Sequence, residues 1–179
     1  MTNRKKSVLR LTYAAVCLAL ALVLPMLTGQ IPQIGQALSP MHIPAFLCGF
    51  LCGWPWGLVV GAVAPLLRFA IFQMPPAPTC YFMAAELAAY GCFSGIFYRL
   101  LPKKIPFIYV SLVAAMVCGR AVDAVVKIVV ANAFGVGQAA LPVILTNTVV
   151  NTVPGIIVQI ILVPAIIIAL RKANLVPNE

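Results

Sequence analysis

Long apolar stretches alternate with short polar or proline-containing breaks along the whole chain. A helix needs roughly 20 apolar residues to cross about 30 Å of hydrocarbon, and runs of this kind recur from the first residues to the last. The pattern predicts an all-α integral membrane protein, built as a single six-span domain over residues 1–179. The expected spans lie at about 11–27, 41–53, 57–72, 79–101, 107–134 and 141–170.

The breaks between these spans carry residues that end helices. The apolar stretch at 41–72 is too long for one span, and the segment 53–57 (GWPWG) divides it. Its tryptophans suit a membrane interface. Prolines mark further breaks at 73–78 and 102–106. The polar segment 28–40 is longer than the 2–8 residues usual between bundle helices, so we expect a functional loop such as a lid.

Composition and charge support this topology. Hydrophobic residues make up 63% of the chain and charged residues only 8%, against about 25% in soluble domains. The basic residues outside the spans gather in the N-terminal segment, the fourth–fifth connection and the C-terminal segment: Arg4, Lys5, Lys6, Arg10, Arg99, Lys103, Lys104, Arg171 and Lys172. The other connections have none, which predicts that both termini lie in the cytoplasm. The net charge of +9 therefore reflects the orientation of the chain in the membrane. We expect the protein to contact membrane lipid and not nucleic acid.

Two local patterns have an ordinary interpretation. The basic N-terminus followed by an apolar run resembles a secretion signal, but no small-residue cleavage site follows, so we expect a retained first span. The six cysteines lie in or beside apolar stretches. Cys48 and Cys52 share a helix face, yet no acid or histidine accompanies them, so buried packing is favoured over a metal site.

Ionisable side chains inside the spans are the main functional signal: Arg68, Glu86, Arg120, Asp123 and Lys127. Each costs roughly 2.5–3.5 kcal/mol at the bilayer centre unless it is paired or hydrated, or binds a ligand. The expected topology places all of them in the middle-to-outer layer. The three on the fifth span share one helix face, so a self-contained salt-bridge ladder is the alternative to a binding site.

The balance of these charges suggests a substrate class. Three cations against two acids leave one positive charge in excess, which favours an anionic or strongly polar ligand. Asn147 and Asn151 add amide groups on the sixth span, either for a ligand or for helix–helix contacts. His42, expected at the outer start of the second span, is either a structural or solvated side chain or a ligand contact.

Catalytic signatures are absent from the sequence. No phosphate-binding loop of the ATPase type occurs, and one histidine with three acids leaves little for membrane catalysis. We therefore expect no enzyme activity, no cofactor and no metal. Ala15 and Ala19 form a small-residue face on the first span, which serves either internal packing or a partner protein.

The chain resembles the substrate-binding S-components of energy-coupling factor (ECF) vitamin transporters. The resemblance rests on the length, the six spans, the basic N-terminus, the first-span alanines, the long first outer loop and the segment 42–61 (HIPAFLCGFLCGWPWGLVVG). It implies an outer-half pocket, with Glu86, Arg120, Asp123, Lys127, Asn147 and Asn151 as substrate-binding candidates and Arg68 and His42 as weaker ones. It also implies that Ala15 and Ala19 contact a transmembrane coupling protein, driven by two cytoplasmic ATPase subunits.

The leading hypothesis is thus a high-affinity substrate-binding subunit of an ECF-type importer. Its substrate would be a vitamin or related micronutrient, carboxylate-bearing or highly polar. The alternative is a self-sufficient small secondary transporter or channel. A membrane enzyme is the least favoured class.

Overall fold

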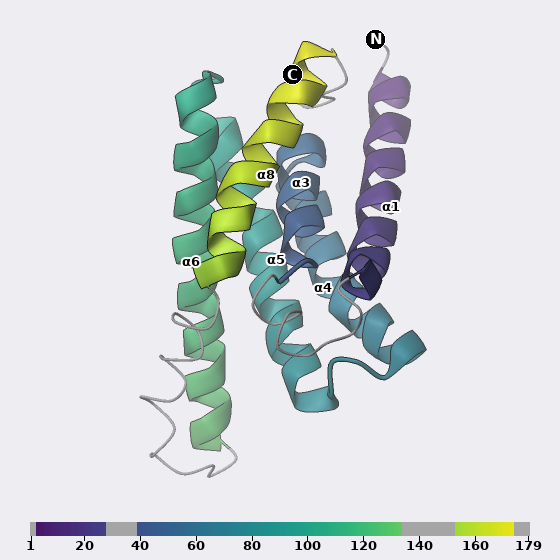
Figure 1. Cartoon of the computed structure of the whole chain (residues 1–179), viewed down its shortest axis with the longest axis vertical. Helices are drawn as coiled ribbons and strands as arrows, with labels where there is room; N and C mark the ends of the chain where they lie inside the picture. The colour runs from purple at the N-terminus through teal and green to yellow at the C-terminus, as the bar shows by residue number, and fades with distance from the viewer. Residues whose placement is uncertain (1–2, 28–38, 134–152, 174–179) are drawn as a thin grey trace.

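The computed structural model describes residues 3–27, 39–133 and 153–173, which form six α-helices and no strand (Figure 1). Five of these helices are long and apolar enough to cross a membrane. The exception, α3, has 11 residues and a length of about 16 Å. The helices are α1 (Asn3–Leu27), α3 (His42–Cys52), α4 (Trp54–Phe72), α5 (Ala77–Leu100), α6 (Ile105–Ala133) and α8 (Val153–Lys172).

The all-helical membrane architecture expected from the sequence is confirmed, with two differences in the described part of the chain. The expected second span, 41–53, is a helix too short to cross the membrane. The break between it and the next helix is Gly53 alone, and α4 starts at Trp54, earlier than expected. Residues 141–152 of the expected sixth span and residues 28–38 of the expected lid (28–40) lie outside the described residues.

Local backbone chemistry explains where two of the helices end. Gly53 adopts φ 93° and ψ 171°, a conformation that residues with a Cβ rarely reach, so the chain can leave α3 and enter α4 within one residue. Pro55 then occupies the first turn of α4, where its missing N–H removes no helical hydrogen bond. Gln73 ends α4 in the left-handed conformation (φ 55°), and its N–H donates to the carbonyl of Phe69 at 2.8 Å.

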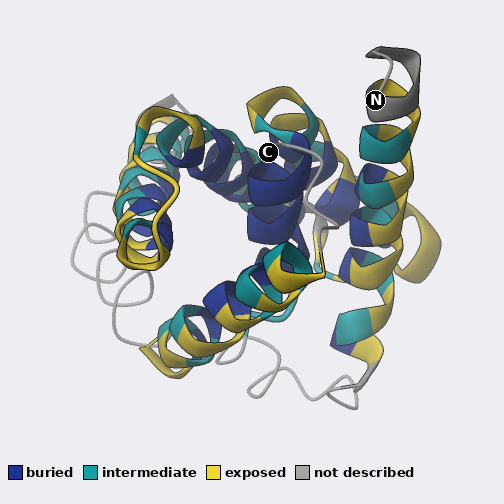
Figure 2. Cartoon of the chain, turned by 90° about the horizontal axis from the view of Figure 1, so that it is seen from above, coloured by how far each residue is buried: buried dark blue, intermediate teal, exposed yellow. Residues whose placement is uncertain are grey.

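The short helix α3 is the centre of the bundle. All of its residues are buried, and it contacts α1, α4, α5 and α8 (Figure 2). Helix α5 packs against α3 and α4 on one side and against α6 on the other. The outward faces of α1, α6 and α8 expose large apolar side chains, for example Val16, Val117 and Ile161. In a membrane protein these faces meet lipid, so the polar side chains have only the interior of the bundle to occupy.

Glycines hold α3, α4 and α5 together at backbone distance. A Cβ on Gly91 of α5 would overlap the carbonyl of Gly57 on α4, and a Cβ on Gly49 of α3 would overlap the carbonyl of Gly91. Farther along the same contact, Gly61 of α4 lies against Leu87 of α5. The glycines of these three helices therefore serve intramolecular packing.

The basic segments expected on one face of the membrane converge at one end of the bundle. Arg10 of α1, Arg99 of α5 and Lys103 of the α5–α6 connection line the same cavity. Nη2 of Arg171, at the end of α8, donates a hydrogen bond of 2.8 Å to the carbonyl of Lys103. The start of α1 and the end of α8 accordingly lie at the same end of the molecule in Figure 1. That this end faces the cytoplasm remains a prediction from the positive-inside rule.

Candidate functional site

A buried polar cluster joins α3 to α5 in the interior of the bundle. Nε2 of His42, at the start of α3, lies 3.6 Å from Oε2 of Glu86 on α5. The hydroxyl of Tyr90, one turn further along α5, donates a hydrogen bond of 2.8 Å to the other carboxylate oxygen. His42 is 4% exposed, Glu86 8% and Tyr90 1%. Both oxygens of the carboxylate thus have a partner, which a buried acid requires.

Packing from two further helices fixes the ring of Tyr90. The ring of Phe46 on α3 lies 4.8 Å from it between centroids, and the imidazole of His42 lies 5.3 Å away. On α6, a Cβ at Gly119 would overlap the Tyr90 ring, so the absence of a side chain there creates the space that the ring fills. Tyr90 is therefore held between α3 and α6, and it in turn orients the carboxylate of Glu86.

The ionisable groups of α6 adjoin this cluster. The charge of Arg120 acts on both Glu86 and Tyr90, and the charge of Asp123 acts on Tyr90. Nζ of Lys127 lies 2.6 Å from Oδ2 of Asp123, and its side chain is 26% exposed while that of Asp123 is 2% exposed. One pair of the salt-bridge ladder considered as the alternative for α6 is therefore present, between Asp123 and Lys127.

His42 occupies a different environment from the membrane interface where the sequence placed it. It is buried and lies beside Glu86, more than two turns from the start of α5. Its Nδ1 is buried and has no hydrogen-bond partner among the described residues. A buried ring nitrogen without a partner is unfavourable in an empty protein interior, so it is a group that a ligand can satisfy. The isolated histidine in the sequence gave no signal of this depth.

Arg68 lies apart from the cluster. Its Nη1 donates a hydrogen bond of 2.8 Å to the carbonyl of Leu22 in the last turns of α1, and its guanidinium lies 5.4 Å from the ring centroid of Phe72. The hydrogen bond joins α4 to α1, and the ring contact lies within α4 and stabilises the charge of the buried guanidinium. Among the described residues, the Glu86 carboxylate contacts His42 and Tyr90, and Arg68 binds α1 instead. Arg68 therefore does not count in the charge balance of this cluster.

The remaining candidates divide into two groups. Ala15 and Ala19 are exposed on the outward face of α1, whereas Ala14 and Cys17 face the core. Asn147 and Asn151 lie outside the described residues.

All six cysteines are free, and within the described ranges no group of three or more His, Cys, Asp or Glu side chains is placed to hold a metal ion.

Comparison with known proteins identifies the family of the chain. The family profile "ECF transporter, substrate-specific component" matches residues 9–167. The thiamine transporter ThiT of Bacillus subtilis (strain 168) is 32% identical over 127 residues, a match that covers 65% of this chain and 66% of the relative, slightly less than two thirds of its length. No solved structure matches the chain. Because the family profile covers most of the chain, this membrane protein belongs to the family of substrate-specific components of ECF transporters.

Proposed function

We propose that this protein is the high-affinity substrate-binding subunit of an ECF-type importer in a bacterial cell membrane, with both termini in the cytoplasm. It would capture a highly polar vitamin or related micronutrient from outside the cell. Proteins of this family bind substrate and are not enzymes, and the ATPase is on partner proteins. The observation that carries the proposal is the buried cluster of His42, Glu86 and Tyr90, with the unpartnered Nδ1 of His42 and the neighbouring charges of α6. Such a concentration of polar groups between membrane helices is typical of a substrate site.

The substrate class follows from the charge balance of the cluster. Without Arg68, the acids Glu86 and Asp123 are matched by Arg120 and Lys127 before His42 is counted. The excess positive charge that favoured a carboxylate-bearing ligand therefore disappears. A carboxylate-bearing nutrient remains compatible with Arg120, while Glu86 offers an acceptor for a cationic or hydrogen-bond-donating ring. Aromatic rings beside the acid, Phe46 and Tyr90, suit a flat heterocycle.

Thiamine is the first compound to test, because the relative described above is named a thiamine transporter. It carries a positive charge and two rings, which agrees with an acid flanked by aromatic side chains. Pantothenate and nicotinate are informative comparisons because both are carboxylates. Preferential binding of either one over thiamine would assign the principal contact to Arg120 and not to Glu86.

The decisive experiment identifies the ligand that remains bound. We expect protein purified in mild detergent to release a small polar nutrient that mass spectrometry identifies, and the same compound to bind again to ligand-free protein. The Asp123→Asn and Arg120→Ala variants should bind it more weakly. Folded protein that retains no ligand and binds none of the vitamins offered would contradict the proposed function.

A second experiment tests the energy source. We propose a transmembrane coupling protein and two cytoplasmic ATPase subunits as partners, with the exposed face of Ala15 and Ala19 on α1 as the docking surface. Tagged protein expressed together with a coupling module should retain the coupling protein and the ATPases. Substrate flux into liposomes that contain this chain alone would instead indicate a self-sufficient transporter or channel.

A further inference from the structure

The imidazole of His42 has one nitrogen in contact with the protein and one without a partner. Nε2 lies 3.6 Å from Oε2 of Glu86, whereas Nδ1 is buried and makes no hydrogen bond with the described residues. An unsatisfied nitrogen of this kind costs free energy in the ligand-free protein, so a substrate group that meets it gains affinity. We rest this inference on the proposed function, because His42 belongs to the same site.

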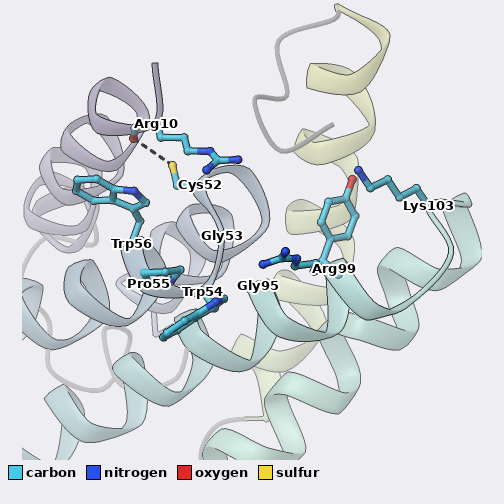
Figure 3. A pocket seen from close by; sticks show the side chains of 10 residues that line it. Arg10, Cys52, Gly53, Trp54, Pro55, Trp56, Gly95, Arg99 and Lys103 are labelled. Carbon is cyan, nitrogen blue, oxygen red and sulfur yellow. Dashed lines mark hydrogen bonds between the residues drawn. The ribbon is translucent and has the colours of Figure 1, made fainter. Parts of the chain in front are cut away.

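His42 lies at the end of α3 that points away from the basic segments. At the other end of this helix, Sγ of Cys52 donates a hydrogen bond of 3.3 Å to the carbonyl of Arg10, beside the cavity at the basic end (Figure 3). The 11 residues of α3 span about 16 Å, so His42 is well separated from that cavity. With the basic end predicted to be cytoplasmic, His42 lies toward the side from which substrate would be captured.

The carboxylate of Glu86 determines which ring nitrogen carries the hydrogen. An ionised carboxylate only accepts hydrogen bonds, so a lone pair on Nε2 at 3.6 Å from it would be repelled. The hydrogen is therefore favoured on Nε2. A neutral imidazole carries a hydrogen on one nitrogen only, which leaves Nδ1 with a lone pair. In this form Nδ1 is an acceptor and requires an N–H or O–H donor on the ligand.

The charges around the ring favour its neutral form. Glu86 and Tyr90 of α5 face it, and the charge of Arg120 on α6 acts on that same carboxylate. Arg120 and Lys127 already match Glu86 and Asp123 in number. A second proton on His42 would therefore add an uncompensated charge inside the membrane, which is costly.

The other helices that pack against α3 direct their described charged groups elsewhere. Arg68 of α4 binds the backbone of α1. The basic residues of α8 are in its last turn, where Arg171 binds the carbonyl of Lys103. The charged residues of α1 are confined to positions 4–10, at the basic end of the bundle. Within the described part of the chain, Glu86, with the groups of α5 and α6 around it, therefore dominates the electrostatics of the ring.

We propose that His42 is a specificity residue of the substrate site, whose neutral ring accepts a hydrogen bond at Nδ1 from an N–H or O–H group of the substrate. The favoured substrate then carries an amine, amide or hydroxyl hydrogen at this position. A ligand that offers only acceptors would place one of them against the lone pair of Nδ1. A proton and the substrate compete for that lone pair, so affinity should fall as the solution becomes more acidic.

Two amide substitutions separate the roles of the ring nitrogens. In His42→Gln the amide reaches the position of Nε2 and can donate to Glu86, but it leaves no acceptor at the position of Nδ1. In His42→Asn the shorter side chain places its amide oxygen near the position of Nδ1 and does not reach Glu86. Isothermal titration of the detergent-purified full chain with thiamine and with pantothenate, which both carry donor groups, compares the variants. His42→Gln should bind the preferred compound about tenfold more weakly, the effect of one unsatisfied buried donor, and His42→Asn should bind it more tightly than His42→Gln.

The pH profile of binding is a readout that a packing role would not change. For the unchanged protein, affinity should fall by up to about tenfold per pH unit once the ring is protonated, in a titration from about pH 8 to pH 5.5. For His42→Gln the profile should be flatter, because an amide does not titrate in this range. Glu86 and Asp123 are present in both proteins, so the difference between the two profiles isolates the ring of His42.

Equal pH profiles, tighter binding at lower pH, or unchanged affinity in folded His42→Gln would overturn the inference. So would preferential binding of nicotinate, whose anion has no N–H or O–H group. Circular dichroism shows whether the variants are folded, and if His42→Gln is not, the pH profile of His42→Asn decides in its place. Folded, unchanged protein that binds none of the three compounds contradicts the proposed function and the inference together, whereas binding that is insensitive to His42 contradicts the inference alone.

Discussion

Nε2 of His42 lies 3.6 Å from Oε2 of Glu86, so the first residue of the central short helix meets an acid in the interior of α5. The tyrosine hydroxyl that binds the other oxygen of the same carboxylate completes an arrangement in which Glu86 has a partner on each side. A substrate that enters here would bind to polar groups that the protein already holds in a fixed orientation.

Replacement of Glu86 by Gln tests whether the carboxylate contacts substrate. The amide keeps the shape and can still accept the hydrogen bond from Tyr90, but it removes the charge that faces His42 and Arg120. Charge-assisted hydrogen bonds contribute about 1.5–3 kcal/mol, so affinity for the retained ligand should fall at least tenfold. Isothermal titration of purified protein measures this change. Unchanged affinity in a folded variant would restrict Glu86 to a structural role.

A methyl group at Gly119 should disturb the site without touching a polar atom. The Cβ of Gly119→Ala would overlap the ring of Tyr90 and displace it from Phe46 and Glu86. Overpacking of this kind typically costs about 1–3 kcal/mol of stability. We expect a lower melting temperature in detergent together with weaker ligand binding. The double variant Gly119→Ala/Tyr90→Phe is the control, because the methyl should lower affinity less once the hydroxyl no longer binds Glu86.

The variant Arg68→Ala should separate packing from binding. It removes the hydrogen bond to Leu22, which joins α4 to α1, and the ring contact with Phe72 within α4. Loss of a hydrogen bond made by a charged group lowers stability by about 1.5–3 kcal/mol. The melting temperature should therefore fall, while ligand affinity changes less than twofold. A loss of affinity as large as that of Glu86→Gln, at equal stability, would return Arg68 to the substrate site.

A bulky residue at Ala15 should affect assembly alone. The Ala15→Phe side chain points away from the core, so it leaves the packing of Ala14 and Cys17 intact but prevents close approach of another helix. Co-purification with a coupling module should decrease while ligand binding stays the same. Val16→Phe is the matched control, because Val16 is 50% exposed but not small. Equal loss of assembly in both variants would show that the alanine face is not specific.

The sequence predicts the long helices well because their signal is local. Apolar length and proline-containing breaks define α5 and α6 to within two residues at each end. The turn at Gly53 was harder to locate, since the GWPWG segment offers several helix-breaking residues and only the backbone conformation shows that one glycine suffices. The short length of α3, by contrast, already follows from the expected range 41–53.

The candidate site depended on packing that one sequence does not reveal. Asp123 and Lys127 follow helical spacing, and the structure brings them together. The depth of His42 depends on how far α3 slides along α5, which the contact between Gly49 and Gly91 determines. The position of Arg68 depends on where α4 meets α1, and the partner turned out to be a backbone carbonyl that has no signature in the sequence.

The glycine contacts among α3, α4 and α5 have a mechanical consequence. Helices that touch backbone to backbone cannot slide or separate without opening voids, so these three should move as one rigid block. His42 and Glu86 belong to two members of that block, and their separation should stay constant throughout a transport cycle. Helix α6 meets this block where Gly119 lies against the ring of Tyr90, so any displacement of α6 would act directly on the site.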